Sequence, residues 1–336
     1  MDDIDVTRLN DFTYYAPHLL RVKTKPPSPQ IVPFQFWPEQ QALNNLFESE
    51  LRERGYVRVN VLKSRRVGMS TLTEGRIFHA VHTTPNTHAF IVAHDKDGLN
   101  TIFDMSKLFY ECLPPRFKPL KRYSSKKELV FENPNDKTRF IEPGLRSKIE
   151  VFSANKVTAS RSGGYSYAHF SEVAFYQQAE ELLTAVIPSI PDVPGTMIVR
   201  ESTANGRGDF FHNEWLLAKE GESNYKNIFF SWLGFKEYRA PTLPDKQARQ
   251  LLSTLDDEEK VLRKKYKATP EQLWWRRSKL LDYHGDVDKF HQEYPTTDTE
   301  AFIASGSPYF SRQRIREYMT KVVEPDFTGD IDAKRL

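Results

Sequence analysis

The segment from Lys63 to Thr71 contains the residues of this chain best suited to hold an anion. An alternating apolar stretch precedes it and an amphipathic stretch follows it. A strand leading into a helix would aim backbone N–H groups and the positive end of the helix dipole at a phosphate. Against the pattern G-x-x-x-x-G-K-[ST], Gly68 matches the second glycine and Ser70 matches the hydroxyl. Met69 replaces the lysine, so the segment predicts either a nucleotide site or an ordinary basic turn.

The chemistry of such a site could survive the missing lysine. Lys63, which stands where the first glycine belongs, could reach the β and γ phosphates from the end of the strand. Ser70 could bind Mg²⁺, and Gly68 would let the backbone approach the phosphates closely. The candidate nucleotide-binding residues of this segment are Lys63, Ser64, Arg65, Arg66, Val67, Gly68, Met69, Ser70 and Thr71.

A second candidate segment reads YSYAHFSEVAFY and places Glu172 after a short apolar stretch. A carboxylate at the end of such a strand, in the position of a Walker B motif, could orient and activate a water molecule for attack on the γ-phosphate. Ser171 stands where an aspartate is expected, so the contact of Glu172 with Mg²⁺ would be weak or would pass through water. The alternative is an ordinary surface glutamate.

A third segment, VRESTANGRGDFFHNEW, has small polar side chains where a strand would end. Ser202, Thr203, Ala204 and Asn205 could sense the γ-phosphate, or they could form a plain turn.

The elements that would position these segments alternate between strand and helix. We expect strands at 57–61, 88–93, 167–170, 197–201 and 228–232, and helices at 38–55, 70–81, 99–110 and 179–186. Segments 128–132, 138–141 and 148–153 are expected to form β-structure at a sheet edge. This alternation predicts an α/β three-layer core with a mainly parallel sheet.

The ends of the chain have a different pattern. Four prolines between Pro26 and Pro33 predict an irregular arm over residues 1–35. Beyond Phe235 helices dominate, and the sequence Thr-Pro-Glu-Gln at 269–272 predicts a helix start with a capping threonine and a proline in the first turn.

Composition excludes several classes of protein. The chain has 336 residues, of which 39% are hydrophobic and 13% aromatic, enough to build a core of one large or two modest domains. No apolar run is long enough for a membrane helix, and the single cysteine, Cys112, has no internal disulfide partner. We therefore expect a soluble cytosolic protein.

Basic segments at 116–127 and 260–279 suggest either a phosphate-rich partner or solvated faces.

Six segments in the same order resemble the ATPase half of tailed-phage large terminases, and the resemblance covers about residues 36–310. They read FWPEQQAL, KSRRVGMST, IVAHDKDGLNTIF, AHFSEVAFY, ESTANGRGDFFHNEW and FHQEYPTTDTEAFIASG. The resemblance implies a P-loop fold of the ASCE type, in a three-layer α/β sandwich with a small helical C-terminal subdomain. It also implies an ATP- and Mg²⁺-dependent motor that translocates double-stranded DNA into a procapsid.

The resemblance also implies roles for individual residues. Gln40 would contact the adenine, and Lys63 and Ser70 would bind phosphate and Mg²⁺. Glu172 would be the catalytic carboxylate and a second contact for the metal, either direct or through water. Ser202 to Asn205 would form the segment that couples hydrolysis to movement, with Asn205 also counted in the catalytic set. Arg65 is similar to an arginine that acts within its own subunit, and Arg161 to one supplied to a neighbouring subunit.

The resemblance divides the chain into an arm at 1–35, an ATPase core at 36–235 and a helical lid or linker at 236–336. In the family, that last part leads to a nuclease domain that these residues do not include, so we expect no nuclease activity. The expected partners are double-stranded DNA, a portal protein, a small terminase subunit and further copies in a ring, with no membrane. The expected location is the cytoplasm of an infected bacterium, with transient docking on the procapsid.

Two alternatives remain open at this point. Met69 and Ser171 could mark a DNA-binding module whose nucleotide site is inactive. The chain could also be another DNA-dependent ATPase, such as a helicase.

Overall fold

A mostly parallel sheet forms the centre of the computed structural model, which describes residues 4–156 and 164–302. Its strands in chain order are β3 (Val57–Lys63), β4 (His88–Ala93), β5 (Tyr123–Ser124), β6 (Glu128–Phe131), β7 (Ser147–Ser153), β8 (Tyr167–Ser171), β9 (Met197–Ser202) and β10 (Lys226–Phe230). Their spatial order is β10-β3-β9-β8-β4-β7-β6-β5. The strands from β10 to β7 are parallel, whereas β6 runs antiparallel to both β7 and β5.

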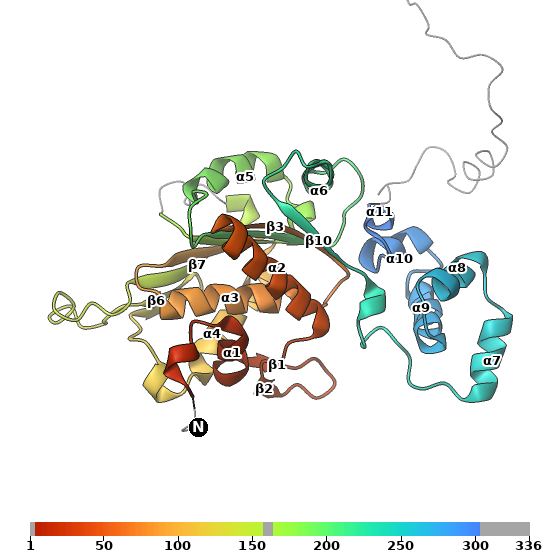
Figure 1. Cartoon of the computed structure of the whole chain (residues 1–336), viewed down its shortest axis with the longest axis horizontal. Coiled ribbons are helices and arrows are strands. Elements are labelled where there is room, and N and C mark those ends of the chain that lie inside the picture. Colours follow the sequence, from red (N-terminus) through yellow and green to blue (C-terminus); the bar gives the residue numbers. More distant parts are fainter. Residues whose placement is uncertain (1–3, 157–163, 303–336) are drawn as a thin grey trace, which may run out of the picture. The chain divides into compact units, whose positions relative to one another are not determined.

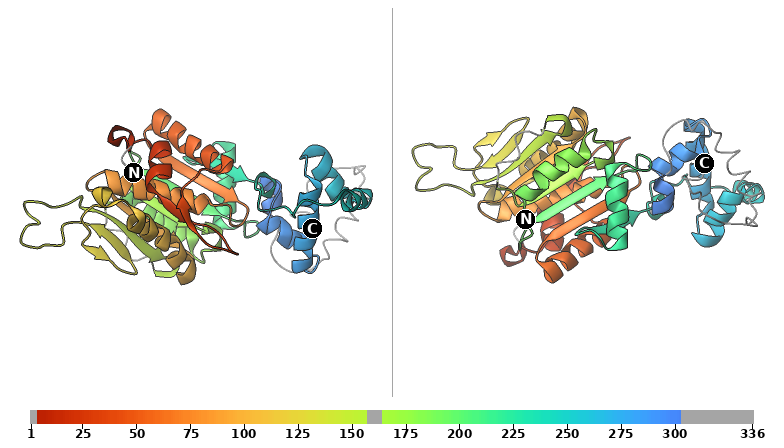
Figure 2. Two further views of the ribbon diagram at one scale, coloured as in Figure 1. Left: turned by 90° about the horizontal axis from the view of Figure 1, so that it is seen from below. Right: turned by 90° about the horizontal axis from the view of Figure 1, so that it is seen from above.

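Helices cover both faces of this sheet (Figures 1 and 2). One face carries α1 (Phe12–Leu19), α2 (Pro38–Arg54), α3 (Met69–Thr83) and α4 (Lys96–Cys112), and the other carries α5 (Ala179–Val186) and α6 (Phe210–Glu220). All seven residues of β3 are buried, as expected for a strand with both faces covered. The predicted three-layer α/β fold is therefore confirmed.

Two apolar clusters fill the spaces between the layers. Consecutive side chains of β3 pack on opposite faces of the sheet. Val61 packs in the cluster that includes α3, and Leu62 packs in the cluster that includes α5 and α6. Because the strands are parallel and adjacent, the carboxyl ends of β3, β9 and β8 meet at one edge of the sheet.

The helix boundaries follow local signals in the sequence. Helix α2 ends at Gly55, which has a left-handed φ of 81°. Helix α9 (Pro270–Asp282) begins with the predicted capping pair, in which Gln272 N donates to Thr269 Oγ1 at 3.3 Å and Thr269 N donates to Gln272 Oε1 at 2.9 Å. The predicted start of this helix is confirmed.

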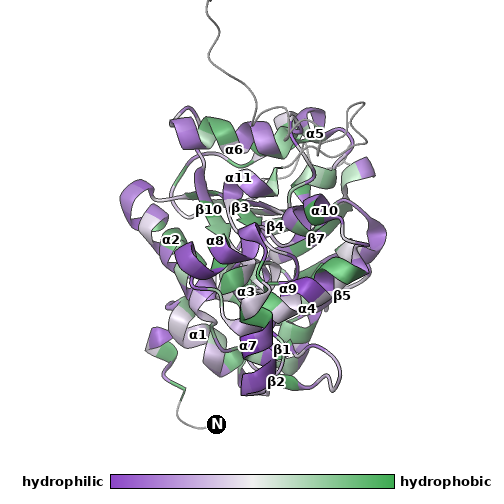
Figure 3. Ribbon diagram, turned by 90° about the vertical axis from the view of Figure 1, so that its right-hand side faces the viewer, coloured by the Kyte–Doolittle hydropathy of each residue, from purple (hydrophilic) through white to green (hydrophobic). Residues whose placement is uncertain are grey.

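Beyond β10 the described chain is helical. The helices are α7 (Asp245–Ser253), α8 (Asp257–Lys265), α9, α10 (Val287–Glu293) and the short α11 (Asp298–Ala301). Figure 3 shows α7 and α8 to be mostly hydrophilic. Within residues 4–156 and 164–302, no helix is both long enough and apolar enough to cross a membrane.

The prediction of an irregular segment over residues 1–35 is wrong. This segment contains α1 and a two-stranded antiparallel sheet of β1 (Arg21–Lys23) and β2 (Ile31–Pro33). Phe12 and Tyr15 are buried, and the side chain of Asp11 accepts a hydrogen bond from Thr13 N that caps α1. The prolines at 26, 27 and 29 lie in the turn between the two strands, where they interrupt no helix.

The strand predicted at 138–141 is also wrong, because these residues form turns. Phe140 and Ile141 are each 88% exposed, so their apolar side chains pack against no core. Asn133 organises the turns by donating from Nδ2 to Thr138 Oγ1 at 3.0 Å. The edge of the sheet is instead completed by β5.

Candidate nucleotide-binding site

The loop between β3 and α3 is anchored at its start and curved at its end. Ser64 N donates to Phe230 O of β10 at 3.0 Å, and Arg65 N donates to Glu293 O at 3.0 Å. Two loop residues have left-handed backbones, Arg66 with a φ of 57° and Gly68 with a φ of 76°. These conformations turn the chain directly from the strand into α3, so the N-terminus of a 15-residue helix opens beside the end of β3.

Met69 explains how this loop departs from the standard pattern. Met69 and Val67 are fully buried in the apolar cluster on the α3 face. A lysine at position 69 would place its charge in that core, which is unfavourable. The cation of this loop is instead Lys63, at the end of β3.

Gln40 braces the loop against the start of α2. Its Nε2 donates to Gly68 O at 2.8 Å, and its Oε1 accepts from Trp37 N at 3.1 Å. Gln40 is buried, and a Cβ placed on Gly68 would lie only 3.0 Å from its Nε2. Its contact with adenine stays a prediction.

An ion pair joins two of the predicted segments. Lys63 Nζ lies 2.8 Å from Glu172 Oε1, with the Lys63 side chain 5% exposed and that of Glu172 28% exposed. Burial alone would lower the pKa of Lys63, but the carboxylates of Glu172 and Glu201 raise it above its ordinary value. Lys63 is therefore held as a buried cation at the mouth of the loop.

The predicted coupling segment holds the other oxygen of Glu172. Its Oε2 accepts from Thr203 N at 3.1 Å and from Ser202 Oγ at 3.3 Å. Ser202 Oγ also accepts from Ala174 N at 3.2 Å, and Asn205 Nδ2 donates to Ala174 O at 3.1 Å. Residues 202–205 thus hold the turn that carries Glu172 in place through these hydrogen bonds.

The backbone of Glu172 has a conformation that is uncommon for a non-glycine residue. Its φ of 57° and ψ of 48° lie in the left-handed region, which is unfavourable for a residue with a side chain. The hydrogen bond from Thr203 and the ion pair with Lys63 hold Glu172 in this conformation.

Sequence reasoning missed Glu201, which lies fully buried at the end of β9. Its Oε1 accepts hydrogen bonds from Ser70 Oγ and, at 3.3 Å, from Ser171 Oγ. The sheet register pairs Ser171 directly with Glu201. The hydroxyl of Ser70 thus contacts Glu201, whereas the partners of Glu172 are Lys63, Ser202 and Thr203.

Glu201 belongs to a fully buried chain of charged groups. His169 lies between two glutamates, with Nδ1 2.7 Å from Glu74 Oε1 and Nε2 3.4 Å from Glu201 Oε1. Burial would raise the pKa of Glu201, but Lys63 and His169 hold it at about 2. Burial would lower the pKa of His169, but the two glutamates raise it to about 9. The sequence signal was a titratable side chain inside each of two short, largely apolar strands, His169 in the middle of β8 and Glu201 next to the end of β9.

The oxygen donors here suit a magnesium ion bound together with a nucleotide. Within the described ranges, no group of three His, Cys, Asp or Glu side chains could hold a metal by itself. Mg²⁺ in phosphate sites usually keeps several waters and takes only one or two protein oxygens. Ser70 supplies a hydroxyl, and Glu201 Oε2 is buried without a hydrogen-bond partner. The donor chemistry therefore fits.

The predicted arginines are placed less centrally. Arg65 Nη1 lies 3.4 Å from Glu293 Oε2 of α10, and its side chain is 54% exposed. Arg66 is exposed, and its carbonyl accepts from Lys25 Nζ at 2.8 Å. Arg161 lies outside the described residues.

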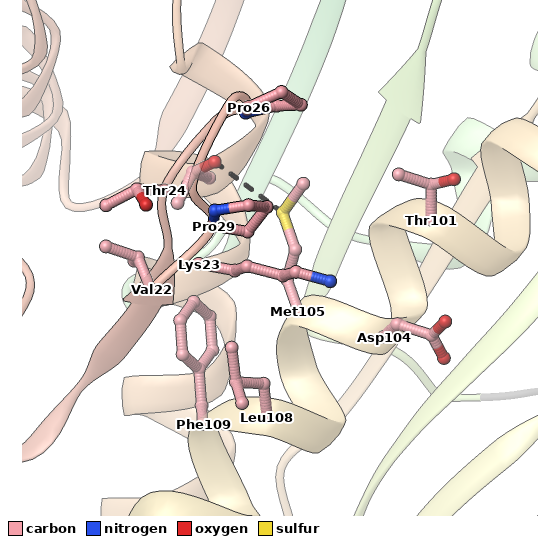
Figure 4. Close-up of a pocket in the computed structure, with 11 residues that line it drawn as sticks. Val22, Lys23, Thr24, Pro26, Pro29, Thr101, Asp104, Met105, Leu108 and Phe109 are labelled. Atoms are coloured by element: carbon pink, nitrogen blue, oxygen red, sulfur yellow. Dashed lines mark hydrogen bonds between the residues drawn. The ribbon is translucent and has the colours of Figure 1, made fainter. Parts of the chain in front are cut away.

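Thr71 faces a different part of the molecule. Its hydroxyl donates to Met105 Sδ at 3.6 Å, and it lines a cavity of about 470 Å³ between the β1–β2 segment and α4 (Figure 4). Neither Lys63 nor Glu172 is among the residues that line this cavity.

Part of the second basic segment, 260–279, pairs with acids of α8. Arg276 Nη2 lies 2.7 Å from Glu258 Oε2, and Arg277 Nη2 lies 2.6 Å from Glu259 Oε2. Arg276 is buried. These arginines therefore hold α8 and α9 together, and a phosphate-rich partner for this segment stays a prediction.

Comparisons with known proteins identify the fold. No family model matches the chain, and no curated protein matches its sequence. The HK97 bacteriophage large terminase has a similar structure, with a TM-score of 0.55 at 14% identity over 92% of this chain and 58% of that one. The ATPase domain of the Thermus phage P74-26 large terminase, in a mutant form, gives a TM-score of 0.48 at 16% identity over 70% of this chain and 94% of that domain. The chain thus spans little more than half the length of the HK97 protein, and it has the fold of phage large terminases.

Proposed function

We propose that this chain is the ATPase motor subunit of a phage large terminase, which hydrolyses ATP to translocate double-stranded DNA into a procapsid. One observation carries the proposal. Lys63 from β3, Glu172 after β8 and the hydroxyl segment after β9 converge at the carboxyl edge of three adjacent strands, beside the start of α3. That edge is where nucleotides bind in sheets of this kind.

The ion pair between Lys63 and Glu172 suggests how ATP binding would release Glu172 for catalysis. Phosphate oxygens would compete with Glu172 for Lys63, since both are anionic partners of the same buried ammonium. Glu172 would then be available to orient the attacking water as general base. Magnesium, when bound with the nucleotide, would neutralise phosphate charge, and Ser70 and Glu172 were the ligands expected from the sequence.

The contacts of Glu172 also support a route from hydrolysis to movement. A shift of this carboxylate away from Lys63 would change its hydrogen bonds with Thr203 N and Ser202 Oγ. The contacts of residues 202–205 would therefore depend on whether ATP or its hydrolysis products are bound. We also propose that Gln40 contacts the adenine. Arg65, from its own subunit, or Arg161, from a neighbouring one, would stabilise the γ-phosphate charge.

The rest of the assembly is part of the same proposal. The ATPase core would span 36–235 and the helical lid 236–336, with DNA, a portal protein, a small terminase subunit and further copies in a ring as partners. The complex would dock on the procapsid in the cytoplasm of the host. DNA contacts would be mainly to phosphates and would weaken steeply with salt.

The first test is Mg²⁺-dependent ATP hydrolysis by the wild type and two variants, with and without linear duplex DNA. Lys63→Ala should lose nucleotide binding and turnover because it removes the phosphate-binding cation. Glu172→Gln should still bind ATP but lose about 100-fold or more in turnover, since it keeps the shape and removes the base. Glu48→Gln is the matched control, because Glu48 forms an ion pair with Arg76 away from the loop.

The outcomes separate the proposal from its rivals. Wild-type turnover by Glu172→Gln would remove this residue from its role. Salt-sensitive DNA binding without turnover under any condition would favour a binding module with an inactive nucleotide site. ATP-driven strand separation on a forked duplex would favour a helicase, and Mg²⁺- or Mn²⁺-dependent cutting of plasmid DNA would contradict the expected lack of nuclease activity.

A further inference from the structure

Position 171 lacks the carboxylate that a P-loop ATPase of this type needs. In such enzymes Mg²⁺ is held by the hydroxyl residue of the phosphate loop and by an aspartate at the end of the Walker B strand. Here the hydroxyl is Ser70, but the aspartate position is Ser171, which is buried and has no charge to offer.

A neighbouring strand places a carboxylate at the same point. Glu201 of β9 is paired in register with Ser171 of β8 on one side and with Val61 of β3 on the other. Its Oε1 accepts hydrogen bonds from both Ser70 and Ser171. The acid therefore lies one strand closer to the phosphate loop than the standard position and contacts the hydroxyl of the loop directly.

A purely structural role explains this glutamate poorly. Glu201 is 0% exposed, and burying an ionised carboxylate is unfavourable unless its oxygens are satisfied. Yet Glu201 Oε2 has no hydrogen-bond partner. His169 Nε2, although 3.4 Å from Oε1, is also without one. Oε2 is therefore available to a further cation at this edge of the sheet.

Neighbouring side chains fix the position of this carboxylate. His169 Nε2 lies 3.4 Å from Glu201 Oε1, and Glu74 Oε1 fixes the ring of His169 from a distance of 2.7 Å. Ser106 Oγ in turn donates to Glu74 Oε2 at 3.1 Å. This chain of contacts resembles the outer-shell support that orients metal-binding groups in general.

We propose that Glu201, together with Ser70, positions the magnesium ion of the bound nucleotide in place of the absent aspartate, with His169 and Glu74 as positioning residues. The inference rests on the proposed nucleotide site. It assigns the metal-directing carboxylate to β9 and leaves Glu172 to act on water alone. It also accounts for Ser171, whose hydroxyl supports Glu201 by donating to it.

The test measures nucleotide affinity with and without magnesium, so it does not depend on turnover. A fluorescent, non-hydrolysable ATP analogue is titrated into the whole chain in excess Mg²⁺ and in EDTA, and the ratio of the two dissociation constants is the readout. The wild type should bind more tightly with Mg²⁺. Glu201→Gln should lose roughly 10- to 100-fold of that enhancement while its affinity in EDTA is retained, because the phosphate-binding Lys63 remains.

Two further variants keep the inference open to refutation. The double variant Ser171→Asp with Glu201→Gln moves the carboxylate to the paired position and should restore much of the enhancement. If Glu201→Gln fails to fold, as judged by circular dichroism, Glu201→Asp keeps the charge but withdraws it by one methylene and should weaken the enhancement. Glu172→Gln is the comparison variant and should keep it.

Each result decides between distinct conclusions. An unchanged Mg²⁺ enhancement in a folded Glu201 variant overturns this inference and leaves the nucleotide site in place. A wild-type chain that binds no analogue in either condition overturns the nucleotide site itself, and this inference with it. Loss of the enhancement in Glu172→Gln instead of Glu201→Gln returns the metal contact to the position expected from the sequence.

Discussion

At the scale of single residues, the loop carries its buried positive charge at a different position from the standard phosphate-loop pattern. Met69 is buried where a phosphate loop usually carries lysine, and Lys63 provides the ammonium from the end of β3. This shift is possible because the two positions flank the same turn. The regular pattern fails at position 69, and Lys63 supplies a cation at the same turn.

Gly68 is the residue of this loop that tolerates least change. Its φ of 76° disfavours any side chain, and an added Cβ would lie 3.0 Å from Gln40 Nε2 and 3.4 Å from the ring of Trp37. We expect Gly68→Ala to lower the free energy of unfolding by the ~1–2 kcal/mol of a left-handed alanine plus the effect of displacing Gln40. Urea unfolding measures the loss.

Gly195 provides the matched control. Its φ is 84°, but a Cβ there would meet nothing within 4 Å. Gly195→Ala should therefore show the backbone effect alone, and equal losses for the two variants would mean that the Gln40 brace contributes nothing.

The site residues that could be predicted from sequence are those adjacent to a recognisable turn. Lys63 ends β3, Glu172 and Thr203 directly follow β8 and β9, and the structure brings the three together. Glu201 and His169 could not be recognised in the same way, because their role depends on which strands are neighbours in the sheet. A linear pattern does not contain that order.

At the scale of elements, α1 and α3 form a close contact that excludes water. Gly75 of α3 makes the approach possible, since a Cβ there would lie 3.2 Å from the ring of Phe12. His79 of α3 lies in the same contact, where its Nε2 is 2.7 Å from Leu9 O and its ring is 4.5 Å from that of Tyr15.

This contact should make stability depend on pH. Burial lowers the pKa of His79 from 6.5 to about 4, so the folded ring stays neutral where the unfolded ring is protonated. The unfolded state binds more protons between these values, and the free energy of unfolding therefore falls as the pH drops from 6.5 towards 4. His79 should account for about 2 kcal/mol of the fall in the free energy of unfolding when the pH drops from 7.5 to 5.0.

Urea unfolding of the wild type and His79→Gln at these two pH values tests the contribution. Glutamine can still donate to Leu9 O but does not titrate, so the variant should lose about 2 kcal/mol less than the wild type on acidification. The same loss in both proteins would show that His79 is not the group responsible.

The elements themselves were predicted well where periodicity was unambiguous. The strands around 57–61, 88–93, 167–170 and 197–201 are all present, as is the helix that starts at Pro270. Helix α1 was missed because Pro17 lies inside it and further prolines follow it closely. The strand expected at 138–141 is absent, and the apolar side chains of Phe140 and Ile141 have no core to face.

At the scale of the whole molecule, a bound nucleotide should stabilise the folded chain. The Lys63–Glu172–Thr203 arrangement exists only in the folded state, so a non-hydrolysable ATP analogue with Mg²⁺ at 100 times its Kd should raise the free energy of unfolding by about 2.7 kcal/mol. Lys63→Ala at the same analogue concentration should gain far less. An equal gain in both proteins would place the binding site elsewhere.

The pairing of β9 between β3 and β8 has one more consequence. Lys63 and Glu172 are 109 positions apart in the chain, and Glu201 lies on the strand between theirs, paired with Val61 and Ser171 in this register. A slip of β9 by one residue would turn Glu201 to the opposite face and bring Ser202 in its place. Binding of a nucleotide analogue would therefore report on strand alignment, because a chain with β9 misaligned could be compact and still fail to bind.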